Sequence, residues 1–355
     1  MIERSGLSVA MIVVALVLAT TAGAQERASF AVGPVRAAPG AMASGFIEVP
    51  AGVDAATRIP VTVVHGAKPG PVLALLAGTH GYEYPPILAL QRLRRELDPA
   101  RLSGTVILVH VANLSSFLGR TIYYSPVDGK NLNRVFPGRA DGTQSERVAH
   151  ALTAEVIERS DYLADLHCGD GNEALRPYSY WTVSGNELVD AASKAMVLAF
   201  GLDHIVIDTE RPTDPRASLY IATTAALRGK PAISTETGML GGSDEASVEL
   251  ALRGCWNLLR HLEMVEGGPV PPPAVVWLDR YEVLRSPVTG LFRPAVREGY
   301  AVAAGALLGT LTDLFGESLG EVRAPFAGVV NYVIATPPIS VGEPLAMVSR
   351  IRATP

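Results

Sequence analysis

The sequence predicts an α/β protein with a mostly parallel mixed sheet covered by helices, followed by a small all-β barrel domain. Three observations predict this arrangement. Short apolar runs alternate with helix-spaced patterns through most of the chain, which is typical of buried parallel strands joined by crossover helices. A Pro- and Gly-rich segment at 267–274 has the composition of a linker. Residues 275–355 then hold short strand patterns separated by glycine turns.

Size and charge limit the classes of function. The chain has 355 residues, enough for one large domain and one small domain. Its net charge of -5 provides no basic footprint for nucleic acid and does not forbid an acidic small-molecule substrate.

The N-terminus, residues 1–24, has the features of a cleavable signal peptide. Arg4 supplies a positive charge, 7–20 is apolar, and Ala22-Gly23-Ala24 matches a small-residue cleavage site. The apolar stretch is shorter than the roughly 20 residues that span a bilayer. We therefore expect cleavage after Ala24, export to the periplasm or the medium, and no stable membrane anchor.

The main domain is predicted at 25–266. Its first residues, up to about 57, have weak strand character. Beyond them the pattern predicts strands at 59–65, 72–77 and 104–111, helices at 86–97, 145–159 and 243–265, and a long functional loop at 113–143. The last helix is expected to begin with Ser243 as its N-cap.

Three short polar runs each follow an apolar strand pattern. They are Gly78–Glu83, Asp165–Gly169 and Ser234–Gly238. In open α/β sheets the chemistry lies just beyond the carboxyl ends of the strands. The sequence therefore brings two histidines and two glutamates to one edge of one sheet.

These residues fit a catalytic zinc site. His80, Glu83 and His167 supply two imidazoles and one carboxylate, and three protein ligands leave a fourth position open for water. Zinc lowers the pKa of bound water toward about 7. Glu236 is then the expected general base, which takes a proton from the water and returns it to the leaving amine. We expect one Zn²⁺ per chain.

The loop at 113–143 carries candidate groups for binding the substrate. Arg134 presents a planar fork that matches a carboxylate, and Asn133 adds a donor beside it. Arg120, upstream on the same loop, is a candidate either for this anchor or for stabilising the oxyanion of the reaction.

Four motifs occur in a characteristic order: Gly-x-His-Gly-x-Glu, Asn-Leu-Asn-Arg-x-Phe-Pro-Gly, Asp-Leu-His-x-Gly and Glu-x-Gly. In this order they resemble the succinylglutamate desuccinylase/aspartoacylase family, which has a zinc carboxypeptidase-like fold. The resemblance covers about 55–350. It implies zinc ligands at His80, Glu83 and His167, a carboxylate site at Asn133 and Arg134, an oxyanion contact at Arg120 and a proton acceptor at Glu236.

The sequence departs from this family pattern at one point. Members that cleave acylaspartate carry an arginine shortly before the catalytic glutamate, where this chain has Ala225 and Ala226. This chain therefore lacks the arginine that reads the aspartate side chain in those members. Tyr220, just upstream, is retained as a candidate for substrate binding.

The small C-terminal domain contains an internal repeat. Ser286–Gly290 and Ala324–Gly328 both read Ser/Ala-Pro-x-x-Gly, and each is followed by a Gly-x-x-Leu. This duplication resembles the biotinyl/lipoyl-carrier barrel. That carrier role needs a lysine, and none follows Lys230, so a structural or gating role is expected.

These features together predict an exported zinc-dependent amidohydrolase that cleaves an N-acyl amide of a small carboxylate-bearing amino acid or amine. One alternative is a metallocarboxypeptidase acting on short or cell-wall peptides, since the same chemistry serves both. Another is a non-catalytic protein that binds zinc or a carboxylate. Glu236 argues against the last, because a mere binding site needs no acid at that position.

Overall fold

The structure is a computed structural model that describes residues 1–2, 27–272 and 274–354. The predicted signal peptide lies outside the described residues, apart from its first two positions. None of the helices in the described part of the chain is long and apolar enough to cross a membrane.

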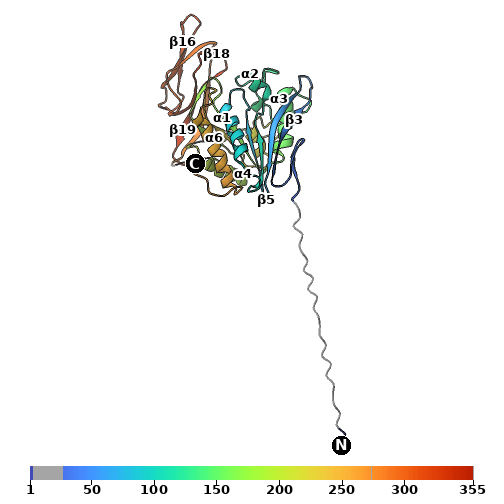
Figure 1. The fold of residues 1–355 in the computed structure, drawn as a ribbon. Helices are drawn as coiled ribbons and strands as arrows, with labels where there is room; N and C mark the ends of the chain where they lie inside the picture. The colour runs from blue at the N-terminus through green and yellow to red at the C-terminus, as the bar shows by residue number, and fades with distance from the viewer. Residues whose placement is uncertain (3–26, 273, 355) are drawn as a thin grey trace.

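A mixed sheet of 13 strands forms the centre of the molecule (Figure 1). Its middle is parallel, because β5 pairs with β6 and β7 in the same direction and β7 pairs in the same way with β11. The antiparallel pairing of β9 with β11 makes the sheet mixed, as expected. From one edge to the other the strands are β14 (Ala301–Val302), β17 (Gly328–Ile334), β19 (Pro344–Arg352), β12 (Val276–Arg285), β10 (His204–Asp208), β9 (Tyr178–Thr182), β11 (Ala232–Glu236), β7 (Tyr162–His167), β5 (Lys68–Ala77), β6 (Ser103–Val109), β4 (Thr57–His65) and β3 (Ala41–Val49), and β8 (Glu173–Leu175) pairs with β17 beside this path.

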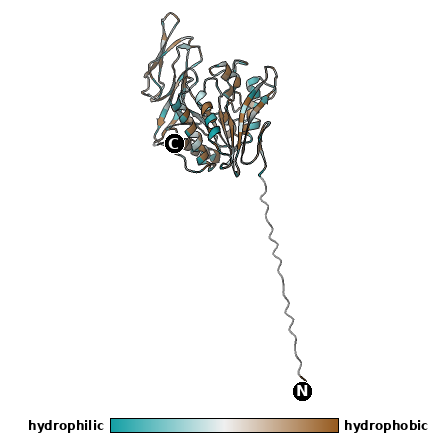
Figure 2. Cartoon of the chain, viewed as in Figure 1, coloured by the Kyte–Doolittle hydropathy of each residue, from teal (hydrophilic) through white to brown (hydrophobic). Residues whose placement is uncertain are grey.

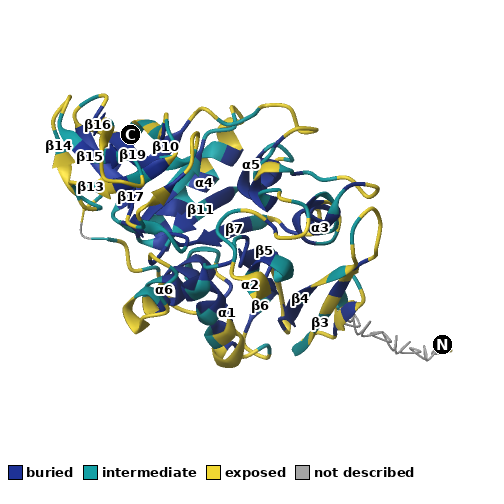
Figure 3. Cartoon of the chain, turned by 90° about the horizontal axis from the view of Figure 1, so that it is seen from above, coloured by how far each residue is buried: buried dark blue, intermediate teal, exposed yellow. Residues whose placement is uncertain are grey.

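Two hydrophobic cores lie on opposite faces of this sheet. Side chains alternate between the faces of a strand, so β5 sends Leu73 and Leu75 into one core and Ala74 and Leu76 into the other, all with no exposed surface. Figure 3 shows these central strands in the buried colour, and Figure 2 shows that they are hydrophobic. Burial on both faces explains why the strands read as continuous apolar runs.

Helices cover both faces of the sheet. α1 (Tyr84–Glu96), α4 (Glu187–Phe200) and α6 (Glu245–His261) belong to the first core. The second core contains α3 (Gln144–Leu152), the π-helical turn η2 (Thr153–Ile157), α5 (Ile221–Ala226), and the hairpin of β1 (Phe30–Val32) and β2 (Val35–Ala37). The loop region 113–143 contains α2 (Leu114–Gly119) and the short 3₁₀ helix η1 (Leu132–Arg134).

One helix start differs from the expectation. The N-cap of α6 is Asp244, whose Oδ1 accepts a hydrogen bond from the backbone N–H of Ser247 at 3.0 Å. Ser243 is therefore not the cap. A carboxylate at this position also interacts favourably with the positive end of the helix dipole.

The C-terminal residues form a β unit, as predicted, but part of it continues the central sheet. β12 pairs in parallel with β10 through Val276–Leu278, and in antiparallel with β19 further along. A separate sheet of four strands has the order β16 (Ser318–Arg323), β15 (Leu307–Thr312), β13 (Gly290–Pro294) and β18 (Pro338–Ile339). A core of its own lies between these layers. The likeness to a biotinyl/lipoyl carrier stays a prediction.

Candidate active site

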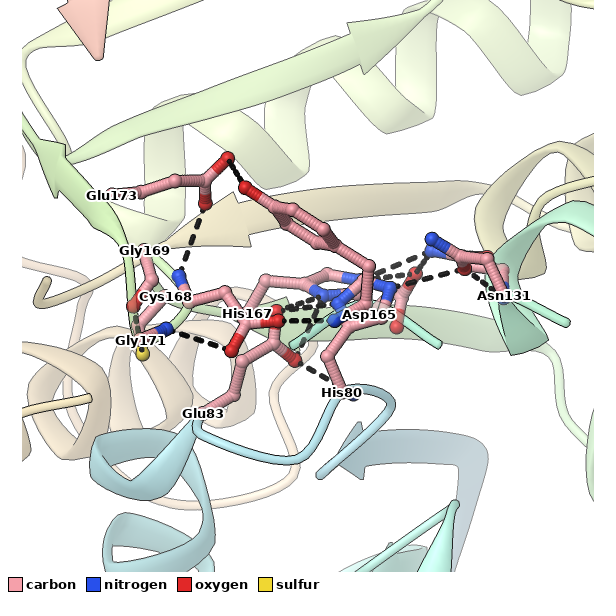
Figure 4. A network of polar contacts seen from close by, with 12 residues as sticks. His80, Glu83, Asn131, Asp165, His167, Cys168, Gly169, Gly171 and Glu173 are labelled. Carbon is pink, nitrogen blue, oxygen red and sulfur yellow. Dashed lines mark hydrogen bonds and ion pairs between the residues drawn. The ribbon is translucent and has the colours of Figure 1, made fainter. Parts of the chain in front are cut away.

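The three predicted metal ligands come together at the carboxyl ends of β5 and β7 (Figure 4). His80 and Glu83 lie on the turn between β5 and α1, and His167 is the last residue of β7. Glu83 Oε1 lies 2.8 Å from Nδ1 of His80 and 2.9 Å from Nδ1 of His167. One possible ligand atom from each residue lies within 4.8 Å of the others. The arrangement is a possible His-Glu-His metal site.

The outer nitrogen of His80 is held by Asn131. Nε2 of His80 lies 3.1 Å from Asn131 Oδ1, which also accepts the backbone N–H of Asn133 at 2.8 Å. That second bond fixes this atom as the amide oxygen, so His80 donates its Nε2 proton to it. A neutral imidazole has a single N–H, and His80 Nδ1 is then an unprotonated nitrogen that faces Glu83.

His167 is oriented in the same way. Its Nε2 lies 2.8 Å from Oδ2 of Asp165, a carboxylate with no exposed surface. In the neutral rings both Nδ1 lone pairs thus point at the oxygens of Glu83, and such an arrangement is repulsive unless a cation lies between them. Hydrogen bonds that orient the far nitrogen of a histidine are typical of metal ligands. The donor set therefore fits a divalent cation such as zinc.

The electrostatic environment favours a cation here. Burial opposes ionisation of Glu83, but His167 and His80 outweigh it and lower its pKa to about 2. Burial also lowers the pKa of His167, and the carboxylates of Asp165 and Glu83 overcome this and raise it well above its usual value. The same negative charges attract a metal ion.

Glu236 lies beside the possible metal site. It ends β11 and pairs directly with His167 of β7 in the parallel register. Its Oε2 is buried and has no hydrogen-bond partner among the described residues. Burial, helped by the negative charge of Glu83, raises the pKa of Glu236 well above its usual value. A carboxyl group of this kind binds a proton readily, although its role as general base stays a prediction.

A cavity of about 330 Å³ opens over this group of residues. It is lined by all the predicted site residues except Arg120, which means His80, Glu83, His167, Glu236, Asn133, Arg134 and Tyr220. The C-terminal unit also contributes to its wall, through Tyr281, Val283, Arg285, Tyr332 and Pro344. The site is therefore bounded by residues from both parts of the chain.

Asn133 has a more internal position than a simple substrate anchor would have. Its Oδ1 accepts the backbone N–H of Ile221 at 2.8 Å, and its Nδ2 donates to Asp165 at 3.1 Å. It thereby fixes Asp165 and joins α5 to the site. The same Nδ2 lies 3.2 Å from Nε2 of His167, so Asn133 contacts both the predicted metal ligand and the carboxylate that orients it.

Arg134 and Tyr220 lie next to each other at the cavity wall. The guanidinium carbon of Arg134 is 4.6 Å from the ring centroid of Tyr220, within the range of a cation–π contact. Arg134 also donates from Nη1 to the backbone oxygen of Asn133 at 2.7 Å. The long side chain is thus held by backbone and ring contacts.

Arg120 is not brought into this group. It is exposed at the end of α2, where it adopts a left-handed conformation with φ of 49°. Tyr123 lines the cavity instead. Its ring forms a T-shaped pair with His80, and its hydroxyl lies 2.9 Å from a carboxylate oxygen of Glu173. The oxyanion role of Arg120 stays a prediction, and the geometry offers no contact in its favour.

Sequence reasoning missed several residues of the site, and two of them, Asp165 and Arg211, differ in the signal that they left. Asp165 had a usable signal, because it precedes His167 by two positions and residues so spaced share one face of a strand. Arg211 had none, since it lies on an irregular loop at 209–219 far from any motif. Its side chain nevertheless lines the cavity.

Comparisons with known proteins agree with this geometry. Residues 69–262 match the model of the succinylglutamate desuccinylase/aspartoacylase catalytic domain. The N-alpha-acetyl-L-2,4-diaminobutyric acid deacetylase of Halomonas elongata is 31% identical over 322 residues, covering 86% of this chain and 91% of that protein. The product-bound structure of the ectoine utilization protein EutE (DoeB) from Ruegeria pomeroyi has a TM-score of 0.78 at 29% identity, covering 87% of this chain and 95% of that one. A succinylglutamate desuccinylase from Silicibacter sp. TM1040 has a TM-score of 0.78 at 25% identity, covering 91% of this chain and 100% of that one.

Proposed function

Because the chain belongs to the succinylglutamate desuccinylase/aspartoacylase family, we propose that it is a zinc-dependent amidohydrolase that deacylates a small carboxylate-bearing amino acid. The observation that carries this proposal is the arrangement of His80, Glu83 and His167 around one point. Glu236 lies in the same cavity, and its Oε2 has no hydrogen-bond partner in the part of the chain that the structure describes.

We assign metal binding, proton transfer and substrate binding to different residues of the cavity. His80, Glu83 and His167 would hold the metal, which when bound would polarise the amide carbonyl and lower the pKa of water. Glu236 accepts the proton of the attacking water on its free Oε2 and delivers it to the leaving nitrogen. Arg134 binds the substrate carboxylate, which fixes the amide relative to Glu236.

The relative from Halomonas elongata supports an acetyl group as the acyl part. Its printed name describes removal of acetyl from the α-nitrogen of 2,4-diaminobutyrate. We take the same N-acetyl amino acid as the first substrate to test here. The alanines at 225 and 226, where acylaspartate-cleaving members carry an arginine, favour this class over N-acetylaspartate.

A metallocarboxypeptidase is the second candidate function. It would use the same metal ligands, base and carboxylate anchor, and the predicted signal peptide would expose it to extracytoplasmic peptides. Export is part of our proposal for either activity. For the C-terminal unit we propose a structural role in shaping the cavity, since it contains no lysine to acylate.

The test is a hydrolysis screen of zinc-loaded protein that begins at Gln25. The substrates are N-acetyl-L-2,4-diaminobutyrate, N-acetylaspartate, N-succinylglutamate and peptides with free C-termini. We expect release of acetate from the first compound, and no release by His80→Ala and His167→Ala variants. Hydrolysis of peptides alone would select the carboxypeptidase, and no hydrolysis of any compound would overturn the proposal. Fractionation of cells that produce the full chain tests export.

A further inference from the structure

Arg211 is a second arginine in the wall of the active-site cavity, and nothing in the motifs accounts for it. It follows β10 on the loop at 209–219, and only 14% of its side chain is exposed. Burying a guanidinium is costly unless its charge is balanced, so its place in the cavity wall requires an explanation from its contacts.

One edge of the Arg211 side chain forms an ion pair with a buried carboxylate. Its Nε pairs with Oδ2 of Asp208, the last residue of β10, which has no exposed surface. The other oxygen of Asp208 accepts the hydroxyl of Tyr281 at 3.2 Å. Tyr281 belongs to β12, so the C-terminal part of the chain helps to fix this ion pair.

The opposite edge of Arg211 is open. Within the described residues, neither Nη1 nor Nη2 has a hydrogen-bond partner, and the residue lines the cavity. A guanidinium has five N–H donors, and four of them lie on these two nitrogens. A purely structural counterion of Asp208 would not need to direct its donor-rich edge toward an open space.

Two tyrosine rings hold the guanidinium in place. Its carbon lies 4.0 Å from the ring centroid of Tyr220 and 5.2 Å from that of Tyr180. Arg134 contacts the same Tyr220 ring at 4.6 Å. Both arginines therefore touch the same ring at the wall of the same cavity.

We propose that Arg211 is a specificity-determining residue that binds the carboxylate of the substrate together with Arg134, which lines the same cavity. This inference rests on the proposed function, because it concerns the ligand of the same cavity. Two arginines recognise an acid more strictly than one, because a neutral analogue leaves several donors unpaired in a partly buried site.

The experiment compares an acid with its amide. Calorimetry measures the binding of L-2,4-diaminobutyrate and its carboxamide, which are products rather than substrates and are not consumed. Steady-state kinetics then compare kcat and KM for the N-acetyl derivatives of these two compounds, which are the corresponding substrates. In the wild type we expect the acids to be preferred. In Arg211→Lys this preference should fall by about 10- to 100-fold, because lysine keeps the charge but loses the fork. The loss should appear mainly in KM.

Two further variants separate binding from folding. Asp208→Asn combined with Arg211→Met removes the whole ion pair without leaving a buried charge, and should show the same loss of preference. Arg216→Met removes an arginine of the same loop whose side chain is 90% exposed and pairs with Asp214. It should behave as the wild type.

Three results would overturn the proposal. One is a wild type that binds acid and amide equally. Another is an Arg211→Lys variant that keeps its preference. The third is an equal loss of affinity for both compounds accompanied by a lower melting temperature, which would mark Arg211 as structural only. Because binding of the products needs no turnover, a protein that discriminates the acid but hydrolyses nothing would contradict the proposed function and leave this inference intact.

Discussion

Asp165 and His167 lie two residues apart on β7, and Oδ2 of Asp165 is 2.8 Å from Nε2 of His167. The alternation of side chains along the strand puts both on one face. Asp165 also accepts a hydrogen bond from Nδ2 of Asn133. A single buried carboxylate therefore orients a predicted metal ligand and connects it to the loop that carries Arg134.

This relationship predicts the effect of Asp165→Asn. The amide has no negative charge and accepts the Nε2 proton less strongly, so His167 becomes a weaker and less ordered ligand. We expect zinc affinity to fall by about 10- to 100-fold. Competition with a chelator measures it.

Asp141→Asn is the matched control for this experiment, because the Asp141 side chain is 87% exposed. Its zinc affinity should equal that of the wild type. Unchanged affinity in the Asp165→Asn protein would show that the bond to Nε2 does not orient the metal ligand.

Gly81 gives a prediction about stability. A Cβ at this position would lie 2.4 Å from the backbone oxygens of Ser116 and Thr121, too close for either to remain in place. Gly81→Ala should therefore destabilise the fold by about 1–3 kcal/mol, as overpacking typically does. It should also reduce zinc retention, since Gly81 lies between His80 and Glu83. Urea unfolding and elemental analysis measure these effects.

Gly268→Ala is the control for this change. A Cβ there meets no atom within 4 Å, and the backbone needs no positive φ. Its unfolding free energy should stay within about 0.5 kcal/mol of the wild type, as for ordinary surface changes. Equal stability of the two variants would mean that the turn before α1 tolerates a side chain.

His110 predicts part of the pH dependence of stability. Burial, assisted by the charge of Arg94, lowers the pKa of His110 to about 4. Its Nε2 bonds to Thr62 Oγ1 at 2.8 Å, while its Nδ1 has no partner among the described residues, so a second N–H would be unpaired. The native state thus favours neutral His110.

The sign of the effect follows from the pKa of His110 in the unfolded chain, about 6.5, and in the folded protein, about 4. Between about pH 6.5 and 4 the unfolded chain binds a proton at His110 that the folded chain does not, so stability falls as the pH falls. The loss reaches up to about 3 kcal/mol, since one pKa unit corresponds to about 1.4 kcal/mol. The His110→Gln variant should lose less unfolding free energy than the wild type over this pH range. His150 is exposed, and the His150→Gln variant should lose as much as the wild type. Identical slopes for His110→Gln and wild type would contradict the argument.

Much of the fold could be predicted from the sequence because burial on both faces leaves a strong signal. Each of β5, β7 and β11 contains a run of consecutive apolar residues and leads into a polar run that carries a site residue. Parallel strands bring such ends to one edge. That geometric rule is sufficient to place His80, Glu83, His167 and Glu236 together.

The remaining features depend on long-range pairing, which leaves no local pattern. The parallel pairing of β10 with the first residues of β12 extends the central sheet beyond the predicted linker. The cavity position of Arg211 depends on Asp208 and Tyr281, which are distant in sequence from each other. Arg120 differs from Arg211 in the opposite way. It lies on the loop that carries the Asn133-Arg134 motif, yet it is exposed and does not line the cavity.

The last prediction concerns Glu236 and separates chemistry from binding. Glu236→Gln keeps the shape of the side chain but cannot accept a proton. Because Oε2 of Glu236 has no protein partner among the described residues, the substitution breaks no hydrogen bond at that atom. Zinc content and substrate binding should therefore be retained, while kcat falls by about 10²- to 10⁴-fold, the usual contribution of general acid–base catalysis. The 88% exposed Glu266 supplies the control, and Glu266→Gln should match the wild type in all three measurements. A Glu236→Gln protein with normal kcat would place the base elsewhere, whereas one that has lost its zinc would make Glu236 a part of the metal site rather than the group that moves the proton.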